Sequence, residues 1–167
     1  MDLFGNKKEI IRSIGFYQPF GSLMFHGKVE TRFVRKGKKP PFPKGKYLIY
    51  TTKKECDNAT LYNWCGNDVI LDITKMLHNS NDETRLLNGW AIGIATLSEI
   101  KILTPTDKSY VKFIGEKIEI IDDIPVTKIQ WALHFKDIFK IKPFEWKHGK
   151  QGIGFVPECE LQNIIIE

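Results

Sequence analysis

The chain has 167 residues, of which 42% are hydrophobic and 27% charged, and its formal net charge is +5. This length fits one domain with a sizeable core, since a chain of about 150 residues buries roughly 70% of its extended surface. No apolar run approaches the roughly 20 residues of a membrane-spanning helix, and the N-terminal residues lack the pattern of a secretory signal. We therefore expect a single soluble domain over residues 1–167, located in the cytoplasm and without a membrane partner.

Cysteine and histidine do not predict a metal site. The three cysteines, Cys56, Cys65 and Cys159, are odd in number, and none forms the closely spaced pair of a zinc site or dithiol motif. No two of the four histidines have helix-face metal spacing, and the Gly-rich turn of a dinucleotide-binding fold is missing. We expect reduced cysteines that are buried or half-buried, and neither a metal nor a cofactor.

Positive charge is concentrated in one segment. Residues 28–54 hold ten lysines and arginines against a single acid, Glu30, which gives this segment a net charge of +9. Because the whole chain carries +5, the remaining residues carry −4. A one-sided field of this kind attracts polyanions and is typical of nucleic-acid binding. A lysine-rich loop that is merely solvated is the open alternative, because a charge block alone names no partner.

The first elements in chain order are a strand and a short helix. Residues 10–17 are rich in β-branched and aromatic side chains and predict a strand. Pro19 can then open a short helix that runs through Phe25, with Gly27 placed to end it.

An alternating segment and a proline-rich loop follow. Residues 28–33 alternate, so Lys28, Glu30 and Arg32 share one face of an extended segment. Residues 37–45 contain three prolines and two glycines among lysines, a composition that limits regular structure. We expect this loop to form a fairly stiff basic arm between two strands, at the rim of a cleft.

The rest of the chain alternates between predicted strands and short helices. Strands are expected at residues 46–52, 90–97, 127–135 and 152–156. Helices are expected at residues 69–77, 82–87 and 158–165, while residues 108–121 fit either a short helix or a strand. Because strands outnumber helices but are interleaved with them, the pattern favours an α+β fold with a curved or closed sheet.

Several of these segments, in this order, resemble the ASCH family of the PUA-like superfamily. The resemblance spans roughly residues 10–157 and implies an α+β fold: a PUA-like mixed β-barrel with flanking short helices and a cleft beside the Lys/Glu/Arg segment. The matching pieces are Gln18-Pro19-Phe20-Gly21-Ser22-Leu23, Gly27-Lys28-Val29-Glu30-Thr31-Arg32, residues 45–51, 90–100 and 131–135, and Gly149-Lys150-Gln151-Gly152.

The resemblance also implies a function. Similar proteins are thought to bind RNA or other nucleic acid, and one branch removes the acetyl group from N4-acetylcytidine. That branch uses a lysine and a threonine three positions apart, as Lys28 and Thr31 are, with a glutamate from elsewhere in the chain. The more widespread form of the motif places a glutamate two positions before an arginine, as Glu30 and Arg32 are. The candidate catalytic residues of an enzyme are therefore Lys28, Glu30 and Thr31, and Glu99 and Glu116 are candidates for the distant glutamate.

Binding alone needs cations for phosphate, flat side chains for stacking and hydrogen-bonding groups for the base edge. Trp146 lies in a polar segment beside Lys150, which favours a stacking role. The leading hypothesis is binding of RNA, single-stranded DNA or a modified nucleoside. The alternatives are a hydrolase of an acylated nucleoside or of RNA, and an adaptor that binds an acidic protein. The candidate ligand-binding residues are Gln18, Lys28, Glu30, Arg32, Arg35, Lys38, Lys39, Trp146, Lys150 and Gln151.

Overall fold

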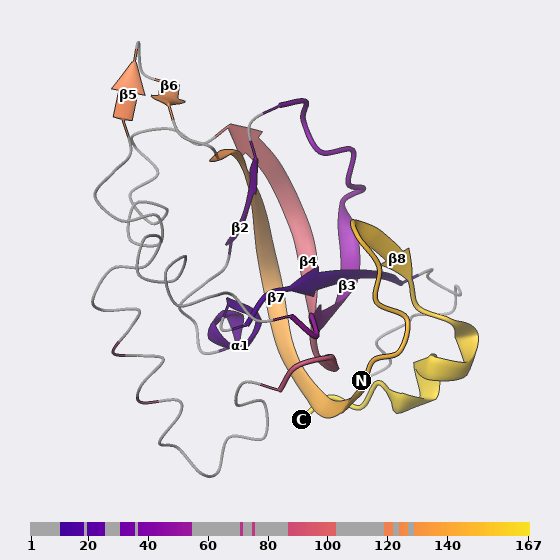
Figure 1. Ribbon diagram of the computed structural model, residues 1–167. Helices are drawn as coiled ribbons and strands as arrows, with labels where there is room; N and C mark the ends of the chain where they lie inside the picture. The colour runs from indigo at the N-terminus through magenta and orange to yellow at the C-terminus, as the bar shows by residue number, and fades with distance from the viewer. Residues whose placement is uncertain are drawn as a thin grey trace.

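A computed structural model describes residues 11–18, 20–25, 31–35, 37–54, 71, 75, 87–102, 119–121, 124–126 and 129–167. In these residues β-strands dominate, together with a short α-helix near the N-terminus and a 3-10 helix near the C-terminus (Figure 1). The strands are β1 (Arg12–Phe16), β2 (Thr31–Arg35), β3 (Gly45–Thr51), β4 (Trp90–Ile102), β5 (Glu119–Ile121), β6 (Ile124–Val126), β7 (Ile129–Glu145) and β8 (Ile153–Phe155). The helices are α1 (Phe20–Met24) and η1, the 3-10 helix (Glu158–Asn163).

Six of the strands form one mixed sheet in the order β2-β7-β4-β3-β1-β8. β1 and β3 run parallel, and the other neighbours in this sheet are antiparallel. The long strands β4 and β7 lie side by side and curve together through the molecule (Figure 1). β5 and β6 form a separate antiparallel pair. This β-rich mixed sheet with few helices agrees with the predicted α+β class.

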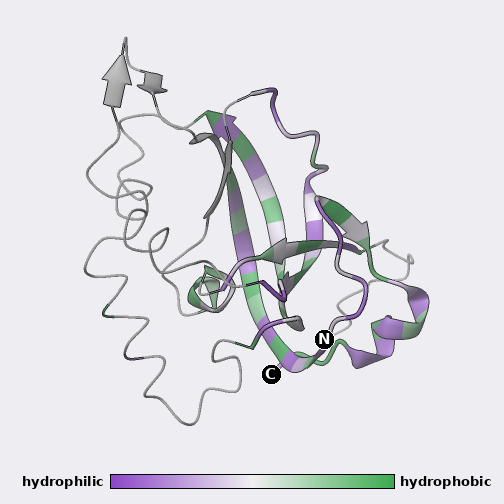
Figure 2. Cartoon of the chain, in the orientation of Figure 1, coloured by the Kyte–Doolittle hydropathy of each residue, from purple (hydrophilic) through white to green (hydrophobic). Residues whose placement is uncertain are grey.

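Two clusters of buried side chains lie on the two faces of the sheet. Successive residues of a strand face opposite sides, so Tyr47 and Ile49 of β3 belong to one cluster while Leu48 and Tyr50 belong to the other. We call these the first and second core cluster. Figure 2 shows the same alternation as changes from green to purple along β7. β3 lies inside the sheet, between β4 and β1, and it is buried on both faces because a core cluster covers each of them.

β7 continues well beyond the strand predicted at residues 127–135. The reason is a break in the alternation near Asp137, which has a positive φ of 48°, where the pairing with β4 shifts register. Leu133 and Phe135 pack in the first core cluster, whereas Ile141 packs in the second, although all three occupy odd positions. The irregularity therefore exchanges the two faces of one continuous strand. A pattern search that expects constant alternation ends the strand at this point.

Most other predicted elements that fall on described residues are confirmed. The helix expected from Pro19 to Phe25 is α1, and the apolar run at residues 90–97 is the start of β4, inside the sheet. The closing helix predicted over residues 158–165 is shorter and of the 3-10 type.

Most residues of two predicted helices, and most of residues 108–121, lie outside the described part of the chain. Of the helix predicted at residues 69–77, Leu71 and Lys75 are described, and both are helical. Of the helix predicted at residues 82–87, Leu87 is described, and it is not helical. None of the helices in the described ranges has the length and apolar character needed to cross a bilayer.

Candidate nucleic-acid interface

The loop of residues 37–44, which we call the basic rim, is fastened to the sheet near both ends. At its start, Trp131 Nε1 donates a hydrogen bond to the carbonyl oxygen of Gly37 at 3.0 Å. Near its end, the Tyr47 hydroxyl donates to the carbonyl oxygen of Pro43 at 2.7 Å. Between these two points Phe42 packs against the first core cluster. The loop is therefore held in place by β3, β7 and the core, as expected of a stiff arm.

The basic rim presents three lysines to solvent. Lys38, Lys39 and Lys44 are exposed, whereas Pro40 between them is buried. Burial raises the pKa of Tyr47 more than the nearby Arg12 lowers it. Its hydroxyl therefore stays protonated and keeps its hydrogen bond to the rim at neutral pH.

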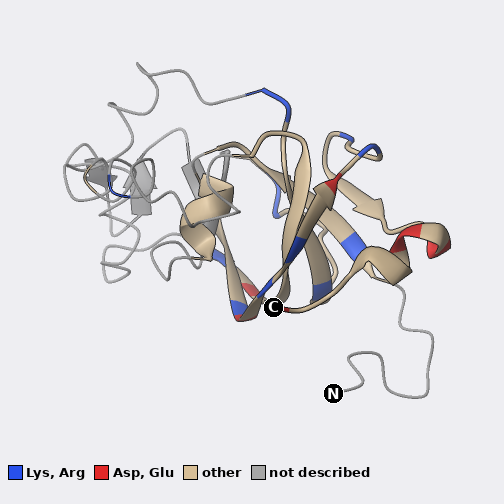
Figure 3. Cartoon of the chain, turned by 90° about the horizontal axis from the view of Figure 1, so that it is seen from below, with Lys and Arg blue, Asp and Glu red and all other residues tan. Residues whose placement is uncertain are grey.

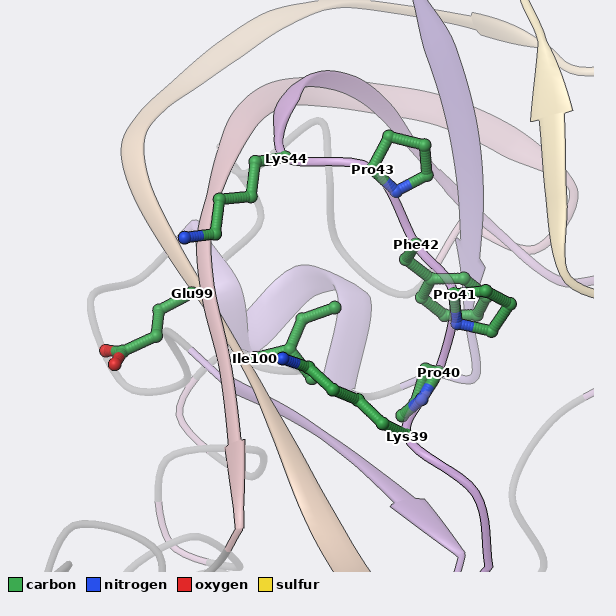
Figure 4. A pocket seen from close by; sticks show the side chains of 8 residues that line it. All are labelled: Lys39, Pro40, Pro41, Phe42, Pro43, Lys44, Glu99 and Ile100. Atoms are coloured by element: carbon green, nitrogen blue, oxygen red, sulfur yellow. The ribbon is translucent and has the colours of Figure 1, made fainter.

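A surface pocket of about 550 Å³ lies beneath the basic rim (Figure 4). Its volume is in the range of small-molecule sites, which run from about 300 to 1,000 Å³. The rim side supplies lysines, prolines and one aromatic ring, and β4 supplies a carboxylate and an aliphatic side chain. In Figure 4 the Lys39 and Lys44 side chains both extend toward β4, whereas the Glu99 carboxylate points away from the rim residues. The lining residues are Lys39, Pro40, Pro41, Phe42, Pro43, Lys44, Glu99 and Ile100.

The pairing of β2, β7 and β4 places three polar residues in one row. Thr31 of β2 pairs with His134 of β7, and His134 also pairs with Glu99 of β4. Neighbouring strands lie about 4.8 Å apart, so Thr31 and Glu99 are roughly 10 Å apart along this row. Arg32 pairs with Leu133 and lies in the adjacent row. Glu99 is a candidate for the distant glutamate of an enzyme, and the strand register is what relates it to Thr31.

Gln18 was predicted to bind a ligand, but its side chain is engaged inside the protein. It is 2% exposed. Its Nε2 donates to the Ser22 hydroxyl at 2.8 Å and to the carbonyl oxygen of Leu87 at 3.0 Å. Its Oε1 accepts from the backbone N–H of Ser22 at 3.1 Å. The Gln18 amide therefore links α1 to Leu87, which lies just before the turn into β4. The role predicted for Gln18 is corrected from ligand binding to a structural one.

The stacking role predicted for Trp146 is also corrected, because its side chain is part of the core and is not exposed to a ligand. It is 2% exposed and stacks on Tyr50, with ring centroids 5.6 Å apart and an interplanar angle of 30°. The ring of His148 contacts it edge-on at 5.1 Å. Its polar neighbours Glu145 and Lys147 are exposed, which is the alternation of a strand continued one residue beyond β7. That alternation was the available signal, and the polar composition of the segment masked it.

The remaining predicted ligand-binding residues fall into two groups. Lys150 and Gln151 are exposed and lie just before Gly152 and β8, at one edge of the sheet, whereas Arg32 and Arg35 lie on β2 at the other edge. Strand pairing therefore does not make these two groups neighbours. The predicted residues Lys28 and Glu30, and the alternative glutamate Glu116, lie outside the described part of the chain.

Cys159 differs from the expected buried or half-buried thiol, because it is free and exposed on the 3-10 helix. That helix carries two glutamates in its first turn and has no buried residue. Within the described ranges, no three side chains of His, Cys, Asp or Glu are grouped so that they could hold a metal ion.

Comparison with known proteins gives a match in structure but not in sequence. No family model matches the chain, and no curated protein matches it either. A crystal structure of ASCH from Zymomonas mobilis matches with a TM-score of 0.52 and 16% identity, covering 91% of each chain. A serine-to-alanine variant of that protein matches with a TM-score of 0.50 and 16% identity, covering 90% of this chain and 91% of the other. At such low identity the likeness shows the fold alone, and the chain has an ASCH-like fold.

Proposed function

We propose that this protein binds RNA, single-stranded DNA or a modified nucleoside through the basic rim and the strands that flank it. The observation that carries this proposal is a fixed loop that holds Lys38, Lys39 and Lys44 exposed, with Lys39 and Lys44 lining a pocket. The +9 segment identified in the sequence includes β2, the basic rim and β3. The resemblance to the ASCH family, now supported at the level of fold, implies the same class of ligand.

The physical basis is electrostatic attraction with little loss of loop entropy. Lysines that neutralise phosphates release condensed counterions, so affinity falls steeply as salt rises. Because hydrogen bonds from Trp131 and Tyr47 already hold the basic rim, binding does not have to order this loop.

The test measures the affinity for a labelled single-stranded RNA over a range of salt concentrations. Each phosphate contact that is lost lowers the salt slope by about one, so Lys38→Ala/Lys39→Ala/Lys44→Ala should lower it by about three. The matched control Lys136→Ala/Lys142→Ala/Lys147→Ala removes the same charge from other exposed positions. Figure 3 shows why the control is needed, since lysines and arginines are also spread over the strands. Absence of salt-sensitive binding, or equal losses in both variants, contradicts the proposal.

We also propose that residues 1–167 form one domain whose sheet closes into a barrel, which would bring Lys150 toward Arg32. The curvature of β4 and β7 supports closure (Figure 1). Distant independent sites have additive effects, whereas residues that share a ligand do not. If the two residues contact one ligand, the affinity losses of Arg32→Ala and Lys150→Ala will be non-additive in the double variant. Strict additivity contradicts a shared site.

Hydrolysis of an acylated nucleoside is a second candidate function, favoured by the row that relates Thr31 to Glu99. In such a reaction a carboxylate accepts a proton from water, and the water oxygen attacks the acetyl carbonyl. The carboxyl group then passes that proton to the departing nitrogen as the C–N bond breaks, which gives acetate and the free amine. Product analysis after incubation with N4-acetylcytidine, and separately with RNA, tests this for the wild type and Lys28→Ala. If the wild type turns over neither substrate, this function is excluded.

A further inference from the structure

We infer that Phe155 of β8 is a base-stacking residue of the proposed nucleic-acid site, and that Arg12 beside it extends the positive charge of the basic rim. The inference rests on the proposed binding function and defines the partner more closely, as a single strand whose bases are unpaired. It depends neither on hydrolysis nor on the pocket beneath the basic rim.

Phe155 is the most exposed large hydrophobic side chain of the described residues, at 59%. A single exposed apolar residue is ordinary on a protein surface, so exposure alone assigns no role. The distinguishing feature of Phe155 is its position on a sheet, beside a basic residue. Aromatic side chains that stand on a sheet and stay open to solvent are platforms on which single-stranded nucleic acids stack their bases.

The strand register fixes the face of the sheet on which Phe155 lies. Arg12 of β1 pairs with Phe155 of β8 and with Tyr47 of β3, so these three residues form one row across three strands. Directly paired residues share a face of the sheet, and Tyr47 belongs to the first core cluster. Two positions along, Ile14 pairs with Ile153, and both pack in or against the same cluster. Phe155 therefore lies on the face of the first core cluster, at the outer end of the row.

This row leads to the basic rim. The Tyr47 hydroxyl donates to the carbonyl oxygen of Pro43, near the end of the rim, at 2.7 Å. Burial raises the pKa of this hydroxyl and the charge of Arg12 opposes the rise, so the guanidinium lies near the same end of the rim. Neighbouring strands are about 4.8 Å apart, which puts the backbone at Phe155 roughly 10 Å from that at Tyr47. A single strand held by the exposed Lys44 can therefore pass over Arg12 and reach Phe155.

The two residues suit different parts of a nucleotide. A phenyl ring stacks on a base whatever its identity, because every base has a π-face. The planar guanidinium of Arg12 can form two parallel hydrogen bonds with a phosphate. In a duplex the bases are already stacked on one another, so the Phe155 ring has access only to the bases of a single strand. The arrangement therefore predicts a strong preference for single strands and little preference among bases.

The experiment measures the affinity of the full chain for a uridine RNA of about eight nucleotides, within the usual size of single-strand sites, over a range of salt concentrations. Loss of one stacked base lowers affinity by about five- to 150-fold, so Phe155→Ala should lose that much and keep the wild-type salt slope. Arg12→Ala should lower the slope by about one. Phe139→Ala is the matched control, because Phe139 is 45% exposed but pairs with Ile94 of the second core cluster, on the other face. It should bind like wild type.

Further comparisons separate stacking from a structural role. Phe155→Trp should keep the affinity, and its additional fluorescence over wild type should fall when the RNA binds. Phe155→Leu keeps an apolar side chain without a flat ring, and it should show most of the loss seen in Phe155→Ala. An abasic strand of the same length has phosphates but no bases, so wild type and Phe155→Ala should bind it equally. Thermal unfolding checks that each variant is folded, as expected for an exposed side chain.

The outcomes distinguish the two proposals. If the wild type binds neither strand in a salt-sensitive way, the binding function is wrong and the stacking role with it. If binding is salt-sensitive but Phe155→Ala or Phe155→Leu binds the uridine strand as tightly as wild type, the stacking role alone is wrong. An equal loss of affinity for the abasic strand in Phe155→Ala also contradicts stacking and leaves the binding function intact.

Discussion

The hydroxyl of Tyr50 makes two hydrogen bonds with the backbone of Lys150, donating to its carbonyl oxygen at 3.0 Å and accepting from its N–H at 3.2 Å. Tyr50 lies on β3 and is 4% exposed, so the loop before β8 is bound to the interior of the sheet. The ring of Trp146 stacks on the same tyrosine. One buried side chain therefore fixes where the exposed residues Lys150 and Gln151 stand.

Tyr50→Phe is expected to destabilise the protein by about 1 to 2 kcal/mol, because two hydrogen bonds are lost and the backbone of Lys150 loses its partner. Urea denaturation measures the free energy of unfolding, and amide exchange at Lys150 should become faster. Tyr17→Phe is the matched control, since Tyr17 is 52% exposed, and it should be neutral. Unchanged stability together with unchanged exchange at Lys150 would show that the hydrogen bonds of the Tyr50 hydroxyl do not hold the loop before β8.

Gly93→Ala is expected to be strongly destabilising, by more than about 2 kcal/mol, or to prevent folding. A Cβ at this position of β4 would overlap the ring of Phe25 and lie 2.7 Å from the carbonyl oxygen of Phe139. A backbone oxygen inside a sheet cannot move away easily.

Gly149→Ala is the control for this substitution, because its Cβ would lie 3.4 Å from the Tyr50 ring, at the edge of ordinary contact. Thermal unfolding of both variants provides the comparison. Similar losses in the two would mean that close packing around Gly93 is not what excludes a side chain there.

The elements that were predicted correctly from the sequence are those whose local composition agrees with their surroundings in the folded protein. β3 and the first part of β4 are rich in aliphatic, aromatic and small residues, and both lie inside the sheet. The strand predicted at residues 127–135 was shorter than β7, because the irregularity at Asp137 exchanges the two faces of the strand. No local signal in the sequence marks a strand that continues through such a break.

The candidate site was harder to predict, because distant contacts decide it. The Gln18 side chain donates a hydrogen bond to the carbonyl oxygen of Leu87, which is 69 positions away in the sequence. The burial of Gln18 could therefore not be predicted from its neighbours in the sequence. Thr31 and Glu99 are related only through the register of β7 between them. The basic rim was predictable, since its prolines, glycines and lysines are all local features. The roles of Lys28 and Glu30 stay predictions.

Glu160 is expected to make the stability of the C-terminal segment depend on pH. The hydrogen bond with His148 at 3.0 Å is the main cause that lowers the pKa of the Glu160 carboxyl, and a bond from Asn163 at 2.7 Å adds to it. Since the folded pKa lies below the unfolded value of about 4.3, the ionised carboxylate stabilises the fold above that value. This contribution is lost as the pH falls through the lowered pKa.

Thermal unfolding at about pH 6 and about pH 3 measures this effect, because the two values lie on either side of the usual carboxyl pKa. Wild type should lose more stability on acidification than Glu160→Gln does, since the variant has no carboxyl to protonate. Glu145→Gln, whose carboxylate lies 3.9 Å from Lys147 on the surface, should behave like wild type. Identical pH dependence of stability in wild type and Glu160→Gln would rule out the Glu160 carboxyl as a cause of the stability loss at low pH.

Ser13 and Gly154 are expected to show a coupled effect on stability. They pair across β1 and β8, and a Cβ on Gly154 would lie 2.6 Å from the Ser13 hydroxyl oxygen. Gly154→Ala alone should cost about 1 to 3 kcal/mol through overpacking. The Ser13 hydroxyl is buried without a hydrogen-bond partner, so Ser13→Ala should be neutral or stabilising.

The double variant Ser13→Ala/Gly154→Ala removes the oxygen that the new methyl group would meet, and it should recover most of the stability lost in Gly154→Ala. Urea denaturation of wild type, both single variants and the double variant gives the coupling free energy, which we expect to exceed about 1 kcal/mol. Overpacking against one atom is relieved by deleting that atom, whereas a backbone restriction at Gly154 would remain. If the stability losses of the two single variants are additive, glycine is required at position 154 because of the backbone conformation of β8. Its contact with Ser13 is then not the reason.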